Sequence, residues 1–125
     1  MDSKKTILYG KTIENLSREV LPGHTISERI SKNSNEDFSV VVSTMDGKHP
    51  RMKNTRSVGI YCIKKGEGTF YADDRVIHVG QNDVISIPPN TVYSFEGDFE
   101  AFMICVPPFD AADCIIFEDE EQELE

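Results

Sequence analysis

The sequence lacks the features that mark membrane-spanning, secreted and disulfide-stabilised proteins. No apolar run approaches the roughly 18 residues of a transmembrane helix, and the first residues, MDSKKTILYG, contain no continuous apolar stretch like that of a secretory signal. The three cysteines, Cys62, Cys105 and Cys114, form no CxxC pair, so neither a disulfide framework nor a thiolate zinc site is expected. We therefore expect a cytoplasmic protein that does not bind membranes.

Motifs for nucleotide binding and for nucleophilic catalysis are missing as well. The segment KKGEGTF, residues 64–70, has glycines without the spacing of either glycine-rich phosphate motif, and no Ser-His-Asp order occurs. Cys62 and Cys105 lie in strand-like segments with no histidine placed to activate a thiol. We interpret both as buried apolar side chains.

Basic charge is absent from the C-terminal end. The net charge is −9, and residues 110–125 contain eight acidic side chains and no basic one, so the other 109 residues carry only about −1. A solvated tail, FEDEEQELE, explains this distribution, and docking of the tail on a basic partner is the alternative. We expect no nucleic-acid binding, because no segment is basic over a long enough span.

The chain contains instead a series of short β-rich segments separated by turn residues, which predicts one all-β sandwich or barrel across residues 1–125. The predicted strands are 25–30, 38–45, 58–63, 69–72, 75–79, 83–88, 91–95 and 101–106. The predicted turns and loops are 31–37, Asp46-Gly47, 65–68, Asp73-Asp74, 80–82, Pro89-Asn90 and Gly97-Asp98, and Pro107-Pro108 ends the last strand. Ahead of them, Thr12 to Val20 fits either a short helix ended by Pro22-Gly23 or irregular chain along a sheet edge.

The glycines and prolines of residues 64–97, KKGEGTFYADDRVIHVGQNDVISIPPNTVYSFEG, match a family pattern. Gly66 matches the glycine that closes the first cupin motif, and Gly80 with Pro88-Pro89-Asn90 matches the frame of the second, with Asn90 where glycine is usual. Asparagine tolerates a positive φ, so the turn survives this exchange. The sequence therefore resembles a small single-domain cupin.

This resemblance implies an all-β double-stranded β-helix, or jelly-roll barrel, with its core at about 38–108. A short N-terminal extension would precede the barrel, and the acidic tail at about 110–125 would follow it. The resemblance also implies a homodimer built through N-terminal strands, a role that Thr25–Ile30 suits.

The metal ligands of cupins are replaced in this chain. The family's glutamate position holds Gly59, its first two histidine positions hold Met52 and Asn54, or Lys53 and Thr55 in the other alignment, and its last histidine position holds Tyr93. Such side chains cannot supply the imidazole and carboxylate ligands of the family's divalent ion, so we expect no metal and no other cofactor. An unusual site of His24, His49 and His78 is the alternative, although only His49 lies near the barrel mouth and His78 is expected to face solvent.

Strand alternation predicts which side chains line the interior. If Gly59 points inward, Tyr61 and Ile63 do so too, and an inward Tyr93 implies an inward Phe95. These residues form either an aromatic, partly polar cavity for one small ligand or a plug that fills the space of the lost metal.

The stretch between Gly47 and Lys65 is basic and contains no acidic residue. Its cations are Lys48, Arg51, Lys53, Arg56, Lys64 and Lys65. These cations have three possible roles. They could prevent an edge strand from pairing with other strands, or Arg51, Lys53 or Arg56 could bind an anionic ligand at the barrel mouth. The third role is a surface that contacts the acidic tail.

Three functions remain open. The first is a metal-free cupin that binds a small anionic or carbohydrate-like molecule through Arg51, Lys53, Arg56, Tyr61, Tyr93 and Phe95. The second is a metal-independent sugar isomerase, epimerase or lyase with Tyr93 as the acid or base, its pKa lowered by the basic stretch, and Lys53 or Arg56 holding the substrate. The third is a dioxygenase-like metalloenzyme with non-standard ligands.

Overall fold

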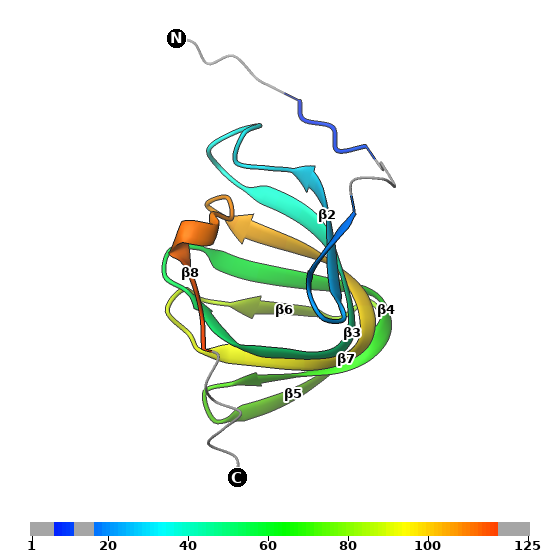
Figure 1. Ribbon diagram of the computed structural model, residues 1–125. Helices are drawn as coiled ribbons and strands as arrows, with labels where there is room; N and C mark the ends of the chain where they lie inside the picture. The colour runs from blue at the N-terminus through cyan, green and yellow to red at the C-terminus, as the bar shows by residue number, and fades with distance from the viewer. Residues whose placement is uncertain (1–6, 12–16, 118–125) are drawn as a thin grey trace.

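The computed structural model describes residues 7–11 and 17–117, and these residues form a curved antiparallel β-barrel (Figure 1). Its elements are β1 (Arg18–Leu21), β2 (His24–Ile30), β3 (Ser39–Asn54), β4 (Val58–Ala72), β5 (Arg75–Gly80), β6 (Val84–Ile87), β7 (Tyr93–Val106), the 3₁₀ helix η2 (Ala111–Asp113) and β8 (Cys114–Ile116). The all-β jelly-roll fold predicted from the sequence is confirmed. Within the described ranges, no helix has the length and hydropathy needed to cross a bilayer.

The strand order is β1-β2-β3-β7-β4-β5, with β6 paired to β4 and β8 paired to β3. Three long strands, β3, β4 and β7, run through both halves of the barrel and curve sharply in between (Figure 1). One half consists of the N-terminal parts of β3 and β4 and the C-terminal part of β7, together with β1, β2 and β6. The other half consists of the remaining parts of the three long strands, together with β5 and β8. A single strand therefore contributes side chains to both walls of the interior.

The long strands correct part of the sequence prediction. Turns were expected at Asp46-Gly47 and Gly97-Asp98, but β3 and β7 continue through them, and Gly47 pairs with Gly97 in register. Both glycines have φ of +136°, which allows a strand to bend without ending. The predicted turn at 65–68 is likewise a bulge inside β4, where Gly66 has φ of +87°.

Other turn predictions are confirmed. A two-residue turn at Asp73-Asp74 separates β4 from β5, the three residues 81–83 separate β5 from β6, and Asn90 has φ of +65° in the turn before β7. Asparagine therefore occupies the left-handed position that glycine usually holds in this motif. Strand β7 ends at Val106, directly before the two prolines.

The N-terminal part of the chain differs from the helical prediction. Residues 12–16 lie outside the described part, but Arg18–Leu21 form β1, which pairs with β2 in a hairpin closed around Gly23. The predicted strand Thr25–Ile30 is confirmed as most of β2, which then pairs with β3. The residues at positions 16 and 20 satisfy a helical period, but the partner strand decides the structure because β1 gains a hydrogen-bonded neighbour there.

Aromatic side chains fill the middle of the barrel. Phe70, Phe95 and Phe99 are at most 2% exposed, and the rings of Phe70 and Phe95 lie 5.0 Å apart. Tyr61 packs edge-on against both Phe70 and Phe95. Full burial of one such side chain contributes about 1.5–3 kcal/mol, so this cluster anchors the two halves of the barrel to each other.

Candidate functional site

A cavity of about 300 Å³ lies inside the barrel beside this aromatic cluster. Its walls come from the β1–β2 hairpin, from β3, β4 and β7, and from the segment Phe109–Ile116 near the C-terminus. Tyr61 and Phe95, both predicted to face inward, line it, together with His24 and His49. The lining is mostly apolar, so its few polar atoms determine which ligand groups can enter.

His49 presents a free nitrogen in this cavity. Its Nδ1 lies 2.7 Å from the carbonyl oxygen of Pro50, which can only accept, so Nδ1 carries the proton and donates. The Nε2 atom of the neutral ring is therefore an acceptor. Burial lowers the pKa of His49, partly opposed by the bond to Pro50. His49 stacks on Phe95 with 4.8 Å between the ring centres, which fixes the direction of Nε2.

His24 lies edge-on against His49, with 5.2 Å between the ring centres. Its Nε2 is 2.9 Å from the hydroxyl of Ser43, whereas its buried Nδ1 has no partner among the described residues. Burial, followed by the neighbouring His49, lowers the pKa of His24 to about 4. Both rings are therefore neutral at pH 7, and the cavity contains no imidazolium.

The convergence of two histidines was not predicted. The sequence placed His24 ahead of the first expected strand, but it begins β2 and pairs with Met45 of β3. The bend of β3 at Gly47 then brings His49 over the same interior. Extending the alternation of Thr25–Ile30 by one residue would have placed His24 on the inner face. His78 is exposed on β5, as predicted, and its Nδ1 lies 3.0 Å from the Thr69 hydroxyl.

Tyr93, at which the resemblance places a metal ligand of cupins, forms a buried pair with Tyr61. Their hydroxyl oxygens are 2.7 Å apart, and both side chains are at most 3% exposed. A Cβ atom at Gly59 would contact Tyr61 at 3.9 Å and Tyr93 at 4.0 Å, and only about 10 Å³ remains open beside them. The room left by Gly59 is therefore filled by the tyrosine pair, and Gly59 does not line the 300 Å³ cavity.

The residues around this pair do not fit a metal. Asn54 uses its side-chain oxygen to accept from the backbone amides of Arg56 and Ser57, at 2.9 and 2.7 Å. Met52 and the hydroxyls of neutral tyrosines are poor ligands for the divalent ions that cupins hold. Across 7–11 and 17–117, no three His, Cys, Asp or Glu side chains come together as a metal site.

The hypothesis of Tyr93 as the acid or base required a lowered pKa, and the surroundings of Tyr93 act in the opposite direction. Burial is the main cause that raises the pKa of Tyr93, and burial and the Tyr93 hydroxyl raise that of Tyr61. Both are neutral hydroxyls at pH 7. Tyr93 is not part of the lining of the 300 Å³ cavity, so Tyr61 is the member of the pair that reaches it.

The basic stretch points away from the cavity. Arg51 lies over the ring of Phe117 at 5.6 Å, Arg56 is 3.9 Å from a carboxylate oxygen of Asp113, and Lys53 is half-buried outside the cavity lining. The edge-strand interpretation does not hold at Lys53, because β8 pairs with β3 there. The acidic end of the chain does meet this surface at Asp113, while residues 118–125 lie outside the described part.

The cation nearest the cavity is one that the sequence did not single out. Arg18 of β1 is exposed and lines the cavity mouth. It was missed because the segment was read as helical or irregular. Its pairing with Ile26, an inward-facing residue of β2, is what turns it toward the cavity.

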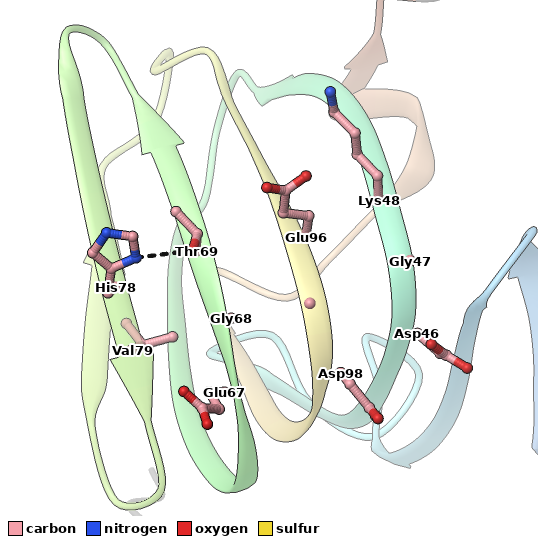
Figure 2. Close-up of a pocket in the computed structure, with 11 residues that line it drawn as sticks. Asp46, Gly47, Lys48, Glu67, Gly68, Thr69, His78, Val79, Glu96 and Asp98 are labelled. Atoms are coloured by element: carbon pink, nitrogen blue, oxygen red, sulfur yellow. Dashed lines mark hydrogen bonds between the residues drawn. The ribbon is translucent and has the colours of Figure 1, made fainter.

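A second depression, of about 730 Å³, lies on the outer surface over the strand bends (Figure 2). Figure 2 shows Asp46, Asp98 and Glu67 in a row across β3, β7 and β4, and these residues are in register. The glycines beside them are structural: a Cβ on Gly68 would lie 2.6 Å from the Phe99 ring. The depression therefore follows from the close packing of the bends.

Comparison with known proteins places the fold. Pac13 from Streptomyces, a nucleoside dehydratase, superposes with a TM-score of 0.75 at 23% identity, over 91% of this chain and 92% of Pac13. KdgF from Halomonas superposes with a TM-score of 0.74 at 17% identity, over 86% of this chain and 99% of KdgF. Oxalate decarboxylase from Bacillus subtilis superposes with a TM-score of 0.72 at 13% sequence identity, over 94% of this chain and 34% of the enzyme. These likenesses show a shared cupin fold.

Three further structures are variants of Streptomyces Pac13 with uridine, in which a histidine is replaced by glutamine or one of two tyrosines by phenylalanine. No curated protein matches the chain. The profile of the AraC-like ligand-binding domain matches residues 44–116, which include β4 to β8 and most of β3 from its bend onward. The chain belongs to the AraC-like ligand-binding domain family.

Proposed function

We propose that the protein binds a small, neutral, hydroxyl-bearing molecule of the sugar or nucleoside type in the 300 Å³ cavity, without a metal. One observation carries this proposal: His49 offers an acceptor nitrogen in one largely apolar cavity. A ligand hydroxyl would donate to this nitrogen, and a hydrogen bond of this kind contributes about 0.5–1.5 kcal/mol.

The neutral histidines favour an uncharged ligand over the anionic one considered from the sequence. The pKa of His24 is about 4 and that of His49 is also lowered, so neither contributes positive charge near pH 7. The lysines and arginines of 48–65 are directed elsewhere. Membership of a ligand-binding family supports small-molecule binding, and a sensory or accessory role is compatible with it.

A second candidate is a lyase that removes water from the bound molecule. Nε2 of His49 would take the proton from a carbon beside a carbonyl, and Tyr61 would give its proton to the departing hydroxide, which leaves as water as the double bond forms. The hydroxyl of Tyr93, 2.7 Å away, would stabilise the tyrosinate, and the proton then returns from His49 to Tyr61. One histidine and two tyrosines are also the residue types replaced in the Pac13–uridine structures, which favours this candidate specifically.

Binding is tested by thermal unfolding with uridine and with simple pentoses. A ligand at about a hundred times its Kd should raise the free energy of unfolding by about 2.7 kcal/mol. We expect His49→Gln to lose this shift and the exposed control His78→Gln to keep it. An equal shift in wild type and His49→Gln would contradict the proposal.

Catalysis is tested separately with Tyr61→Phe. A pentose, whose open-chain aldehyde provides the carbonyl beside the carbon that loses its proton, is incubated with the protein and followed by proton NMR, in which loss of water produces new vinyl signals. The lyase candidate predicts that Tyr61→Phe binds the ligand and forms no product. Binding without product in the wild type as well leaves the protein a binder.

A further inference from the structure

A second cavity, of about 240 Å³, adjoins the first and is here called the vestibule. The two cavities share one wall, made by Arg18, Ile26, Ser39, Val41, Phe109 and Ala111. The vestibule continues from that wall to the loop after β2, and its polar lining includes Glu28. A ligand longer than one ring can therefore extend from His49, past Arg18, into the vestibule.

Arg18 and Glu28 are the unused charged groups of the vestibule. Arg18 pairs with Ile26 across the hairpin, and Glu28 follows Ile26 by two residues on the same face of β2. Neither side chain makes a hydrogen bond or an ion pair with any described residue, although both line one small cavity. The other pair there is already satisfied, since Lys32 Nζ lies 3.1 Å from Asp110.

We infer that the vestibule binds the amide-type edge of a flat ring, so that the ligand is bipartite: a sugar beside His49 and a pyrimidine-like base between Arg18 and Glu28. This inference rests on the proposed function. The arginine can only donate and the carboxylate can only accept, which matches a ring edge with a carbonyl oxygen next to an N–H. Ile26, Ile30 and Phe109 supply apolar surface for the ring faces.

A second sugar is a poorer match for the same space. Its hydroxyls point outward around the whole ring and need partners on every side, whereas the vestibule offers its free polar groups at one place and apolar side chains around them. The net charge of the four ionised side chains there is zero, with Arg18 and Lys32 against Glu28 and Asp110. An uncharged base fits this balance better than a phosphate.

The test uses three ligands: uridine, methyl β-ribofuranoside, which has no base, and 3-methyluridine, whose N–H is blocked. Affinities are measured by titration calorimetry on the full chain. We expect wild type to bind uridine about tenfold or more tightly than the riboside, as one hydrogen bond to a charged group provides. Arg18→Ala and Glu28→Ala should each lose part of this advantage and still bind the riboside.

The methylated ligand identifies the partner of the N–H group. Methylation should weaken binding to wild type and to Arg18→Ala but leave the affinity of Glu28→Ala unchanged. The matched controls are Arg75→Ala and Glu36→Ala, exposed residues outside the lining of both cavities. An equal loss in the controls would mean that general electrostatics is responsible, and the inference would fail.

Two outcomes separate the inference from the proposed function. If wild type binds the riboside as tightly as uridine, the vestibule does not recognise a base, and the sugar site stands alone. If wild type binds none of the three ligands, the proposed ligand class and the inference both fail. All four substitutions are at exposed positions, and unliganded melting temperatures report whether each variant is folded.

Discussion

The buried histidine pair predicts that the protein loses stability in mild acid. The pKa of His24 is about 4 in the folded chain against 6.5 for an ordinary histidine. Above pH 6.5 the ring is neutral in both states and contributes no pH dependence. Between pH 6.5 and 4 the unfolded chain binds a proton that the folded chain does not, so the free energy of unfolding falls as the pH falls.

The expected size follows from the two pKa values. The difference corresponds to about 3 kcal/mol in full, of which about 2 kcal/mol is lost between pH 7.5 and pH 5. His49, whose pKa is also lowered, adds a loss of the same sign. A typical domain has only about 5–15 kcal/mol in total, so the effect is large enough to measure.

The assay is urea denaturation followed by circular dichroism, repeated from pH 7.5 to pH 5. The comparison is with His24→Gln, which keeps a polar side chain and cannot titrate, and with His78→Gln as the exposed control. We expect His24→Gln to show a pH dependence smaller by about 2 kcal/mol over this range, and His78→Gln to behave as wild type. Identical pH dependence in wild type and His24→Gln would refute the neutral, buried state of His24.

Four further substitutions test the barrel interior and the outer bends by chemical denaturation. Tyr61→Phe and Tyr93→Phe should each lower the free energy of unfolding by about 1–2 kcal/mol, because the remaining hydroxyl loses its hydrogen-bond partner. The double variant should lose less than the sum of the two single losses, and strict additivity would contradict a hydrogen bond between the two hydroxyls. Gly59→Glu should destabilise the protein and bring in no divalent metal, since the tyrosines fill the space; stoichiometric metal by elemental analysis would be the opposite result. Asp98→Asn should raise the free energy of unfolding by about 0.5 kcal/mol, and by less at high salt, because Asp98 lies beside Asp46 and Glu67 on the two neighbouring strands. An unchanged denaturation midpoint at low salt would argue against repulsion between these carboxylates.

Turn chemistry and alternation predicted most of the barrel. Asn90 and the turn at Asp73-Asp74 could be predicted because their conformations depend on the residues themselves. The bends at Gly47 and Gly97 could not be distinguished from turns, because glycine is equally suited to a turn and to a bend within a strand. Which of the two forms depends on pairing with the neighbouring strand. Pairing between β3 and β7 through this region keeps both strands continuous.

The site was predictable only in part, for a similar reason. Period-two alternation identified Tyr61 and Phe95 as inward-facing, which depends on one strand alone. The approach of His24 to His49 depends on how two strands pair and where one of them bends, and sequence spacing contains neither. Arg18 required knowledge that β1 is a strand. The homodimer and the cytoplasmic location stay predictions.

The cavity walls divide the chain into two parts with separate tasks. Barrel strands from the middle of the sequence supply His49 and Tyr61, whereas the hairpin of 18–30 supplies Arg18 and His24 and, with residues 109–116, completes the cavity wall. The hairpin lies outside the stretch 44–116 that the family profile matches. Exchange of this hairpin would therefore alter one wall of the cavity, including Arg18 and His24, while His49 and Tyr61 on the barrel strands are left in place.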